Sequence, residues 1–191
     1  MSEAKRRSAR LHLALIATVF FGPLLLAAWL YYGGYFAESL NRSNNGALLE
    51  PIINLGDELP GSGLHIHNDD RWLLLYADDQ SCADDCRDAL YTIRQSRKML
   101  GKEMGRVGQV FLHGATPPDT VFLAAEHPGL ITIEDASLSS LLDNKRPEEQ
   151  PAGGYYLIDP LGNLVLYFQP DIDPSDMVGD IKHLLKLSRI G

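Results

Sequence analysis

The feature that most constrains this chain is a run without charged side chains near its N-terminus. No Asp, Glu, Lys or Arg occurs from Leu11 to Ala37. As a helix, the segment Leu13–Tyr32 would reach ~30 Å, which is the thickness of a bilayer core. Bulky aromatic residues stand at its end, where a signal peptide would carry small residues for cleavage. The sequence therefore predicts an uncleaved transmembrane helix over residues 11–36.

Charge divides unevenly between the two sides of this predicted anchor. Residues 1–10 carry a net positive charge, with Lys5, Arg6, Arg7 and Arg10 against Glu3, whereas the whole chain has a formal net charge of −8. The positive-inside rule then places residues 1–10 in the cytoplasm and everything after the anchor on the other side of the membrane. The acidic body argues against nucleic acid as a partner, because a phosphate backbone would repel it.

For the part of the chain beyond the anchor, the sequence predicts a linker and one folded domain. Residues 37–65 are rich in Asn, Ser, Gly and Pro, which predicts a linker. Over residues 66–191 the apolar patterns predict five strands and four helices. The strands are expected at 71–77, 106–112, 130–133, 155–158 and 164–168, and the helices at 86–104, 120–125, 137–142 and from 174 onward. Residues 159–163 join the last two strands as a hairpin. This order predicts an α/β fold, with a mixed sheet covered by helices on both faces.

The two cysteines, Cys82 and Cys86, follow the first expected strand of this domain and open its first expected helix. A cysteine at a helix N-terminus faces unpaired N–H groups that stabilise a thiolate. A spacing of four residues places both sulfurs on one side of the first turn. There they can close a disulfide or hold one soft metal ion such as Cu(I). Aspartates crowd the pair, which would raise thiol pKa values and attract cations. These are Asp78, Asp79, Asp84, Asp85 and Asp88.

Two further readings of these residues remain open. In an oxidising compartment the cysteines could form a plain structural disulfide, although so short a loop adds little stability. Among the histidines, His113 follows an expected strand and could lie on the cysteine side as a metal ligand. His65 and His67 precede their strand, so they should lie at the opposite edge of the sheet. We expect His127 to be a turn residue.

Three stretches together resemble the Sco/SenC proteins, which are membrane-tethered, thioredoxin-like copper factors of cytochrome c oxidase assembly. They are Trp72–Tyr76, the Cys-x3-Cys pair Cys82–Cys86, and Tyr156–Val165 with its Tyr-Leu-Ile-Asp-Pro-x-Gly pattern. The resemblance implies a thioredoxin-like domain over residues 66–191 and a copper-binding or redox role for the cysteines. It implies an oxidase subunit or another copper assembly factor as partner. It also implies a bacterial inner-membrane location, single-pass, with the domain in the periplasm.

The sequence also departs from that family's pattern. Sco proteins bind copper with both cysteines and with a histidine that lies a few residues before the Tyr-Leu-Ile strand. Residues 147–155 contain no histidine, and Ser81 and Arg87 stand where prolines usually flank the cysteines. The chain therefore resembles a divergent relative that lacks the third copper ligand.

The sequence supports three hypotheses of function. The first is an oxidase assembly factor rather than a metabolic enzyme. It would act as a thiol–disulfide reductant, in which Cys82 attacks and Cys86 resolves, or as a Cu(I) carrier. The second is a non-catalytic membrane scaffold with an inert Cys82–Cys86 disulfide. The third is a general thiol oxidoreductase without copper, against which the missing Cys-x-x-Cys motif counts.

Overall fold

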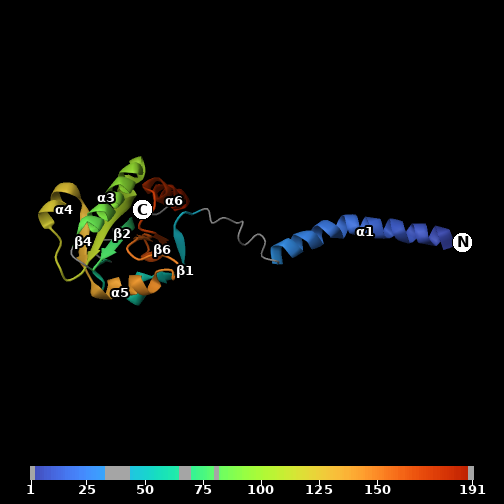
Figure 1. Ribbon diagram of the computed structural model, residues 1–191, viewed down its shortest axis with the longest axis horizontal. Helices are drawn as coiled ribbons and strands as arrows, with labels where there is room; N and C mark the ends of the chain where they lie inside the picture. The colour runs from blue at the N-terminus through green and yellow to red at the C-terminus, as the bar shows by residue number, and fades with distance from the viewer. Residues whose placement is uncertain (1–2, 33–43, 65–69, 80–81, 189–191) are drawn as a thin grey trace. The chain divides into compact units, whose positions relative to one another are not determined.

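The computed structural model describes residues 3–32, 44–64, 70–79 and 82–188. The chain divides into two compact units, Met1–Ser43 and Asn44–Gly191, and each is described by itself. The first unit holds one helix, α1 (Glu3–Tyr32), which contains Pro23 (Figure 1). Its large apolar side chains, such as Leu13, Phe20 and Leu24, are exposed. Over the residues described, no helix reaches the length and hydropathy that a bilayer crossing needs. The anchor over residues 11–36 stays a prediction.

The second unit is built on one mixed sheet of six strands in the order β1-β6-β5-β2-β3-β4. In that spatial order the strands are Ala47–Asn54, Asn163–Phe168, Tyr155–Ile158, Trp72–Asp78, Val107–His113 and Leu130–Glu134. The β1–β6, β6–β5 and β5–β2 pairs are antiparallel, whereas the β2–β3 and β3–β4 pairs are parallel. The mixed α/β sheet predicted from the sequence is confirmed.

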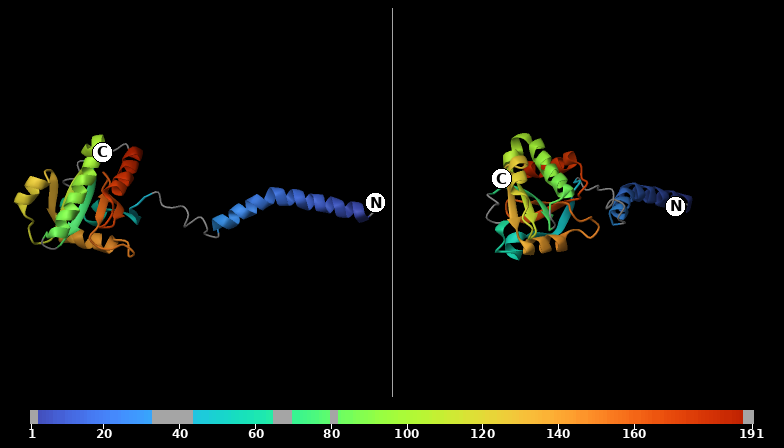
Figure 2. Two further views of the ribbon diagram at one scale, coloured as in Figure 1. Left: turned by 45° about the horizontal axis from the view of Figure 1, so that its top comes forward. Right: turned by 60° about the vertical axis from the view of Figure 1, so that its left-hand side comes forward.

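Helices cover both faces of this sheet, because its central strands are apolar on both sides. Along β2, Trp72, Leu74 and Tyr76 point into one core cluster, while Leu73 and Leu75 point into the other. The first cluster is completed by α3 (Asp84–Met99), α4 (Thr120–Glu126) and α6 (Pro174–Leu187). The second is completed by α2 (Leu55–Glu58) and α5 (Ala136–Lys145). Figures 1 and 2 show α3 and α6 together on one face and α5 on the other, and the 3-10 helix Gly101–Arg106 links α3 to β3.

The predicted hairpin is confirmed. Its turn needs a side-chain hydrogen-bond acceptor at Asp159 and a glycine at position 162. The carboxylate of Asp159 accepts hydrogen bonds from the backbone N–H groups of Leu161 and Asn163 at 2.9 and 2.8 Å. Gly162 has a φ of 84°, which side-chain-bearing residues rarely adopt. An Asp-Pro-x-Gly sequence meets both needs, so β5 and β6 are joined by a short, ordered turn.

The structure corrects the linker expected over residues 37–65 for its described part, residues 44–64. Ala47–Asn54 form β1, which pairs with β6 at the edge of the sheet, and Leu55–Glu58 form α2. Leu49, Ile53, Leu55 and Leu64 are buried in the second cluster. The buried carboxylate of Asp180 on α6 accepts a hydrogen bond from the Gly46 N–H at 2.8 Å, which secures the start of this segment. The folded unit therefore begins at Asn44, because burial outweighs the loop-like composition of residues 44–64.

Candidate functional site

The two cysteines lie at the edge of the sheet where its parallel strands end. β2 ends at Asp78 and α3 begins at Asp84, so Cys82 lies in the connection and Cys86 lies in the first turn of α3, at the strand–helix junction that the sequence predicted. Their sulfurs form a disulfide, with a Cα–Cα distance of 5.0 Å. His113 at the end of β3 is paired in register with Asp78. Ligand sites of open α/β sheets form at this edge.

The two sulfurs of the disulfide differ in access. Cys86 is 1% exposed and belongs to the first core cluster, which also contains Tyr76, Leu90 and Phe111. Cys82 is only partly buried and packs against the surface of that cluster. An incoming group would therefore meet the sulfur of Cys82 first, and Cys86 would stay covered.

The helix start at the disulfide is secured differently from the other helix starts. Asp119, Asp135 and Asp173 cap α4, α5 and α6 by accepting hydrogen bonds from backbone N–H groups. The N-cap of α3 is Ala83, which has no side chain able to do this. The disulfide spans that uncapped turn. Its reduction would therefore remove a covalent constraint from the first turn of α3.

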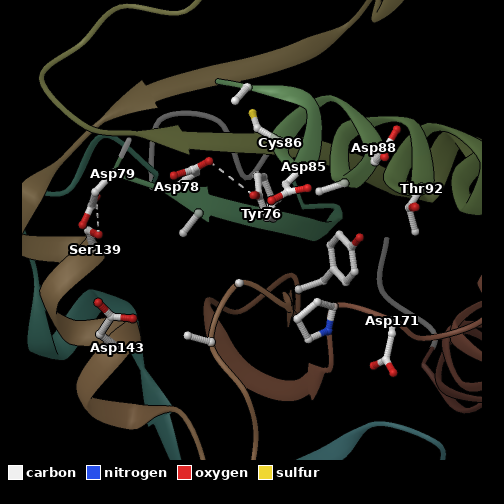
Figure 3. A pocket seen from close by; sticks show the side chains of 17 residues that line it. Tyr76, Asp78, Asp79, Asp85, Cys86, Asp88, Thr92, Ser139, Asp143 and Asp171 are labelled. Carbon is white, nitrogen blue, oxygen red and sulfur yellow. Dashed lines mark hydrogen bonds between the residues drawn. The ribbon is translucent and has the colours of Figure 1, made fainter. Parts of the chain in front are cut away.

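A groove of about 720 Å³ opens beside the disulfide, and Cys86 forms part of its wall. Figure 3 shows aspartates that line it, which come from α3, from α5 and from the chain after β6. We call it the disulfide groove. Its six carboxylates are Asp78, Asp79, Asp85, Asp88, Asp143 and Asp171, and none of the residues that line it is a Lys, Arg or His. The groove is therefore strongly negative.

Tyrosine pKa values report on this environment. Burial raises the pKa of Tyr76, and the charges of Asp78 and Asp85 raise it further. Burial likewise raises the pKa of Tyr155, to which Asp88 adds, while a hydrogen bond with Thr92 opposes the rise. Both rings line the groove, so negative charge is disfavoured there.

Hydrogen bonds fix several parts of the groove wall. The Tyr76 hydroxyl donates to Asp78 Oδ2 at 3.4 Å, and the Ser139 hydroxyl donates to Asp79 Oδ1 at 2.8 Å, which ties α5 to the end of β2 (Figure 3). On the rim, the Tyr167 hydroxyl accepts from the Gly154 N–H at 2.9 Å and donates to the Pro151 carbonyl. These contacts hold the loop that contributes Ala152 and Gly153 to the groove.

The candidate metal ligands are not gathered into a cluster. His113 Nδ1 lies 2.7 Å from the Gly114 carbonyl oxygen, and its ring lies against Phe111 with centroids 5.9 Å apart. Within the described parts of the chain, no three His, Cys, Asp or Glu side chains are close enough together to hold a metal ion. His65 and His67 lie outside the described residues. The assignment of His113 as a third ligand beside Cys82 and Cys86 stays a prediction.

Some residues of the site were predicted from the sequence, and others were not. Of the five aspartates that crowd the cysteines in sequence, all but Asp84 line the groove. Asp143 and Asp171 were not predicted. They are far from the cysteines in the sequence, and only the folding of the sheet places α5 and the chain after β6 near the disulfide. His127 ends α4 as expected of a turn residue, but its ring is buried with its centroid 5.5 Å from that of Phe122.

Comparison with solved structures supports the same fold. Apo Sco1 from Thermus thermophilus matches with a TM-score of 0.55 and 17% identity, over 74% of this chain and 97% of that chain. Copper-bound yeast Sco1 matches with a TM-score of 0.51 and 19% identity, over 64% of this chain and 80% of that chain. At these identities the shared property is the Sco-like thioredoxin fold.

Family comparison covers the sheet from β2 to the end of α6. No curated protein matches the chain. The model of the family described as "Transmembrane-like, thioredoxin-like, C-terminal domain" matches residues 72–188, which is more than half of the chain. That match includes the disulfide, the hairpin and every strand except β1. The chain belongs to the transmembrane-like, thioredoxin-like C-terminal domain family.

Proposed function

We propose that this protein is a membrane-tethered, periplasm-facing assembly factor for cytochrome c oxidase that acts as a thiol–disulfide reductant through Cys82 and Cys86. The observation that carries the proposal is the Cys82–Cys86 disulfide at the start of α3, with one accessible and one buried sulfur beside a groove. The link to the oxidase rests on the resemblance of three sequence stretches to Sco/SenC proteins. The tether rests on the uncharged run from Leu11 to Ala37.

The unequal access of the sulfurs defines the order of the reaction. In the reduced protein, the Cys82 thiolate attacks one sulfur of a disulfide in the partner. A Cys82–partner disulfide forms, and the partner's other sulfur leaves as a thiolate. The Cys86 thiolate then attacks the Cys82 sulfur and releases the partner's second thiolate. The partner gains two electrons, and the protein is left with its Cys82–Cys86 disulfide.

Trapping tests this order directly. Cys86→Ser should accumulate a mixed disulfide with a model disulfide peptide, because no second thiol can resolve it. Cys82→Ser should react far more slowly, because Cys86 is buried. Mass spectrometry of acid-quenched reactions would measure both adducts. Faster trapping by Cys82→Ser than by Cys86→Ser would contradict the assigned roles.

The reduction potential of the pair separates the reductant from a scaffold with an inert disulfide. Structural disulfides of secreted proteins typically have potentials below about −300 mV. We expect the Cys82–Cys86 couple to lie above that value when it is equilibrated with dithiothreitol redox buffers. A potential well below about −300 mV would favour the scaffold.

Carriage of Cu(I) is a second candidate function, with the metal as cargo. The reduced pair would supply two soft thiolate donors, which suit Cu(I), and the negative groove attracts cations. Titration of the reduced protein with Cu(I) against a competing chelator tests it. Binding that is lost in Cys82→Ser would support carriage, and binding unchanged in that variant would exclude these thiolates as the ligands.

A further inference from the structure

The charge of the disulfide groove indicates which partners can reach the disulfide. The groove adjoins Cys86, and its carboxylates come from parts of the chain on different sides of it: Asp85 and Asp88 from α3, Asp143 from α5 and Asp171 from the chain after β6 (Figure 3). No basic residue stands among the residues that line it. Cys82 is bonded to Cys86 in the groove wall, so a polypeptide that reacts at Cys82 brings its flanking residues close to that negative field.

We propose that the disulfide groove is the docking site for a cationic segment of the redox partner, in which Lys or Arg residues flank the reacting cysteines. This inference rests on the proposed function, because it names the partner class of the same disulfide. The disulfide carries out the reaction, and the carboxylates favour positively charged partners. A groove with walls of one charge sign concentrates ligands of the opposite sign and raises their association rate.

The dimensions and exposure of the groove wall fit a peptide rather than a lone ion. A volume of about 720 Å³ exceeds what a bare cation needs and falls in the range of sites for small organic ligands and side chains. Asp79, Asp85, Asp88, Asp143 and Asp171 are all exposed, so they can contact an incoming chain without leaving the core. The loop held by Tyr167 supplies an uncharged rim at Ala152 and Gly153.

Three small disulfides that differ in charge test this selectivity on the reduced, detergent-solubilised full chain. They are cystamine, a dication; bis(2-hydroxyethyl) disulfide, which is neutral; and dithiodiglycolate, a dianion. Each oxidises the protein by the two-step exchange given above and leaves as two thiols. Each rate is divided by the rate of the same probe with dithiothreitol, so that intrinsic probe reactivity cancels.

At low salt we expect the normalised rate with cystamine to exceed that with dithiodiglycolate by about tenfold or more, with the neutral probe between them. The ratio should fall toward one at about 1 M salt, where the Debye length is ~3 Å. Because changes in thiol reactivity affect all three probes alike, the ratio reports docking. A low-salt ratio near one would overturn the inference and leave the proposed function standing, and failure of every probe to react would overturn both.

Matched variants locate the effect. Asp85→Asn/Asp88→Asn and, separately, Asp143→Asn/Asp171→Asn should each reduce the cystamine-to-dithiodiglycolate ratio by severalfold. Asp57→Asn/Glu58→Gln removes two exposed carboxylates on α2 that do not line the groove, and it should leave the ratio unchanged. A ratio that falls equally in all three variants would assign the effect to overall net charge and overturn the groove as the docking site.

Discussion

The hydroxyl of Tyr167 illustrates how single side chains shape this site. It lies on β6, yet it satisfies both the N–H of Gly154 and the carbonyl of Pro151 in the loop before β5. A Cβ added to Gly154 would lie 2.0 Å from the Phe168 carbonyl oxygen, so the loop approaches the strand too closely for any other residue. One phenol and one glycine therefore fix a rim of the disulfide groove.

Tyr167→Phe should lower the free energy of unfolding by about 1–3 kcal/mol, because the buried Gly154 N–H would lose its acceptor. Urea denaturation of the reduced and the oxidised protein would measure the change. Tyr91→Phe is the control, because Tyr91 is 52% exposed on α3 and should change stability by no more than about 0.5 kcal/mol. Equal losses in the two variants would refute the role of Tyr167.

The burial of His127 predicts that the stability of the domain depends on pH. Burial lowers its pKa from 6.5, and Arg94 lowers it further, against a smaller opposing effect of Glu126. The unfolded chain then binds more protons than the folded chain between the lowered value and 6.5. The contribution of His127 to folding stability is fully present above pH 6.5. It is lost as the pH falls from 6.5 through the lowered pKa of the folded state.

Urea denaturation at pH 7.5 and pH ~5.5 should therefore give a lower free energy of unfolding at the acidic value. His127→Phe, which keeps a ring against Phe122, should weaken this dependence. An identical loss on acidification in the native chain and in His127→Phe would assign the dependence to other groups.

At the scale of elements, β1 decides where the folded unit starts. It lies at the sheet edge, and only two of its residues, Leu49 and Ile53, are buried. Together with Leu55 and Leu64 they complete the second core cluster. Burial of each such side chain is worth about 1.5–3 kcal/mol, so the four together are comparable with a typical net stability of about 5–15 kcal/mol.

Two truncated chains test this boundary. A chain that begins at residue 44 should fold with a cooperative urea transition, whereas one that begins at residue 66 should show no such transition or lose most of its stability. Circular dichroism during urea titration would compare them. Equal stability of the two chains would show that residues 44–64 are dispensable.

The elements that could be predicted from sequence are those with local signals. The central strands are continuous apolar runs, the hairpin has its Asp159 and Gly162, and α3 has its helical periodicity. β1 was not predicted, because an edge strand with two buried residues shows almost no alternation of apolar and polar residues. The residues before it are also Asn and Gly, which are typical of loops. The cysteine pair was evident from its spacing and position. The groove was not, since its walls come from residues as distant in the chain as Asp85 and Asp171.

At the scale of the whole molecule, the chain joins the helix α1 to an acidic thioredoxin-like unit. The large apolar side chains of α1 are exposed, which is costly in water and favourable in lipid. A tether of this kind would confine the disulfide groove to the membrane surface. This arrangement is part of the proposal.

Membrane attachment predicts a specific partition. In membranes washed with alkaline carbonate, the full chain should stay in the pellet, and a chain that begins at residue 44 should move to the supernatant. Immunoblotting of the two fractions measures this. Release of the full chain by the wash would contradict an anchor over residues 11–36.

The most direct test of the central claim is cytochrome c oxidase activity in membranes of cells whose only copy of this protein is Cys82→Ser/Cys86→Ser. The account predicts that this activity is lost, or falls severalfold, while the variant is present at its normal level in the membrane. Asp57→Asn, expressed in the same way, should support full activity. Unimpaired oxidase activity with the double cysteine variant would contradict a redox or copper role for the pair.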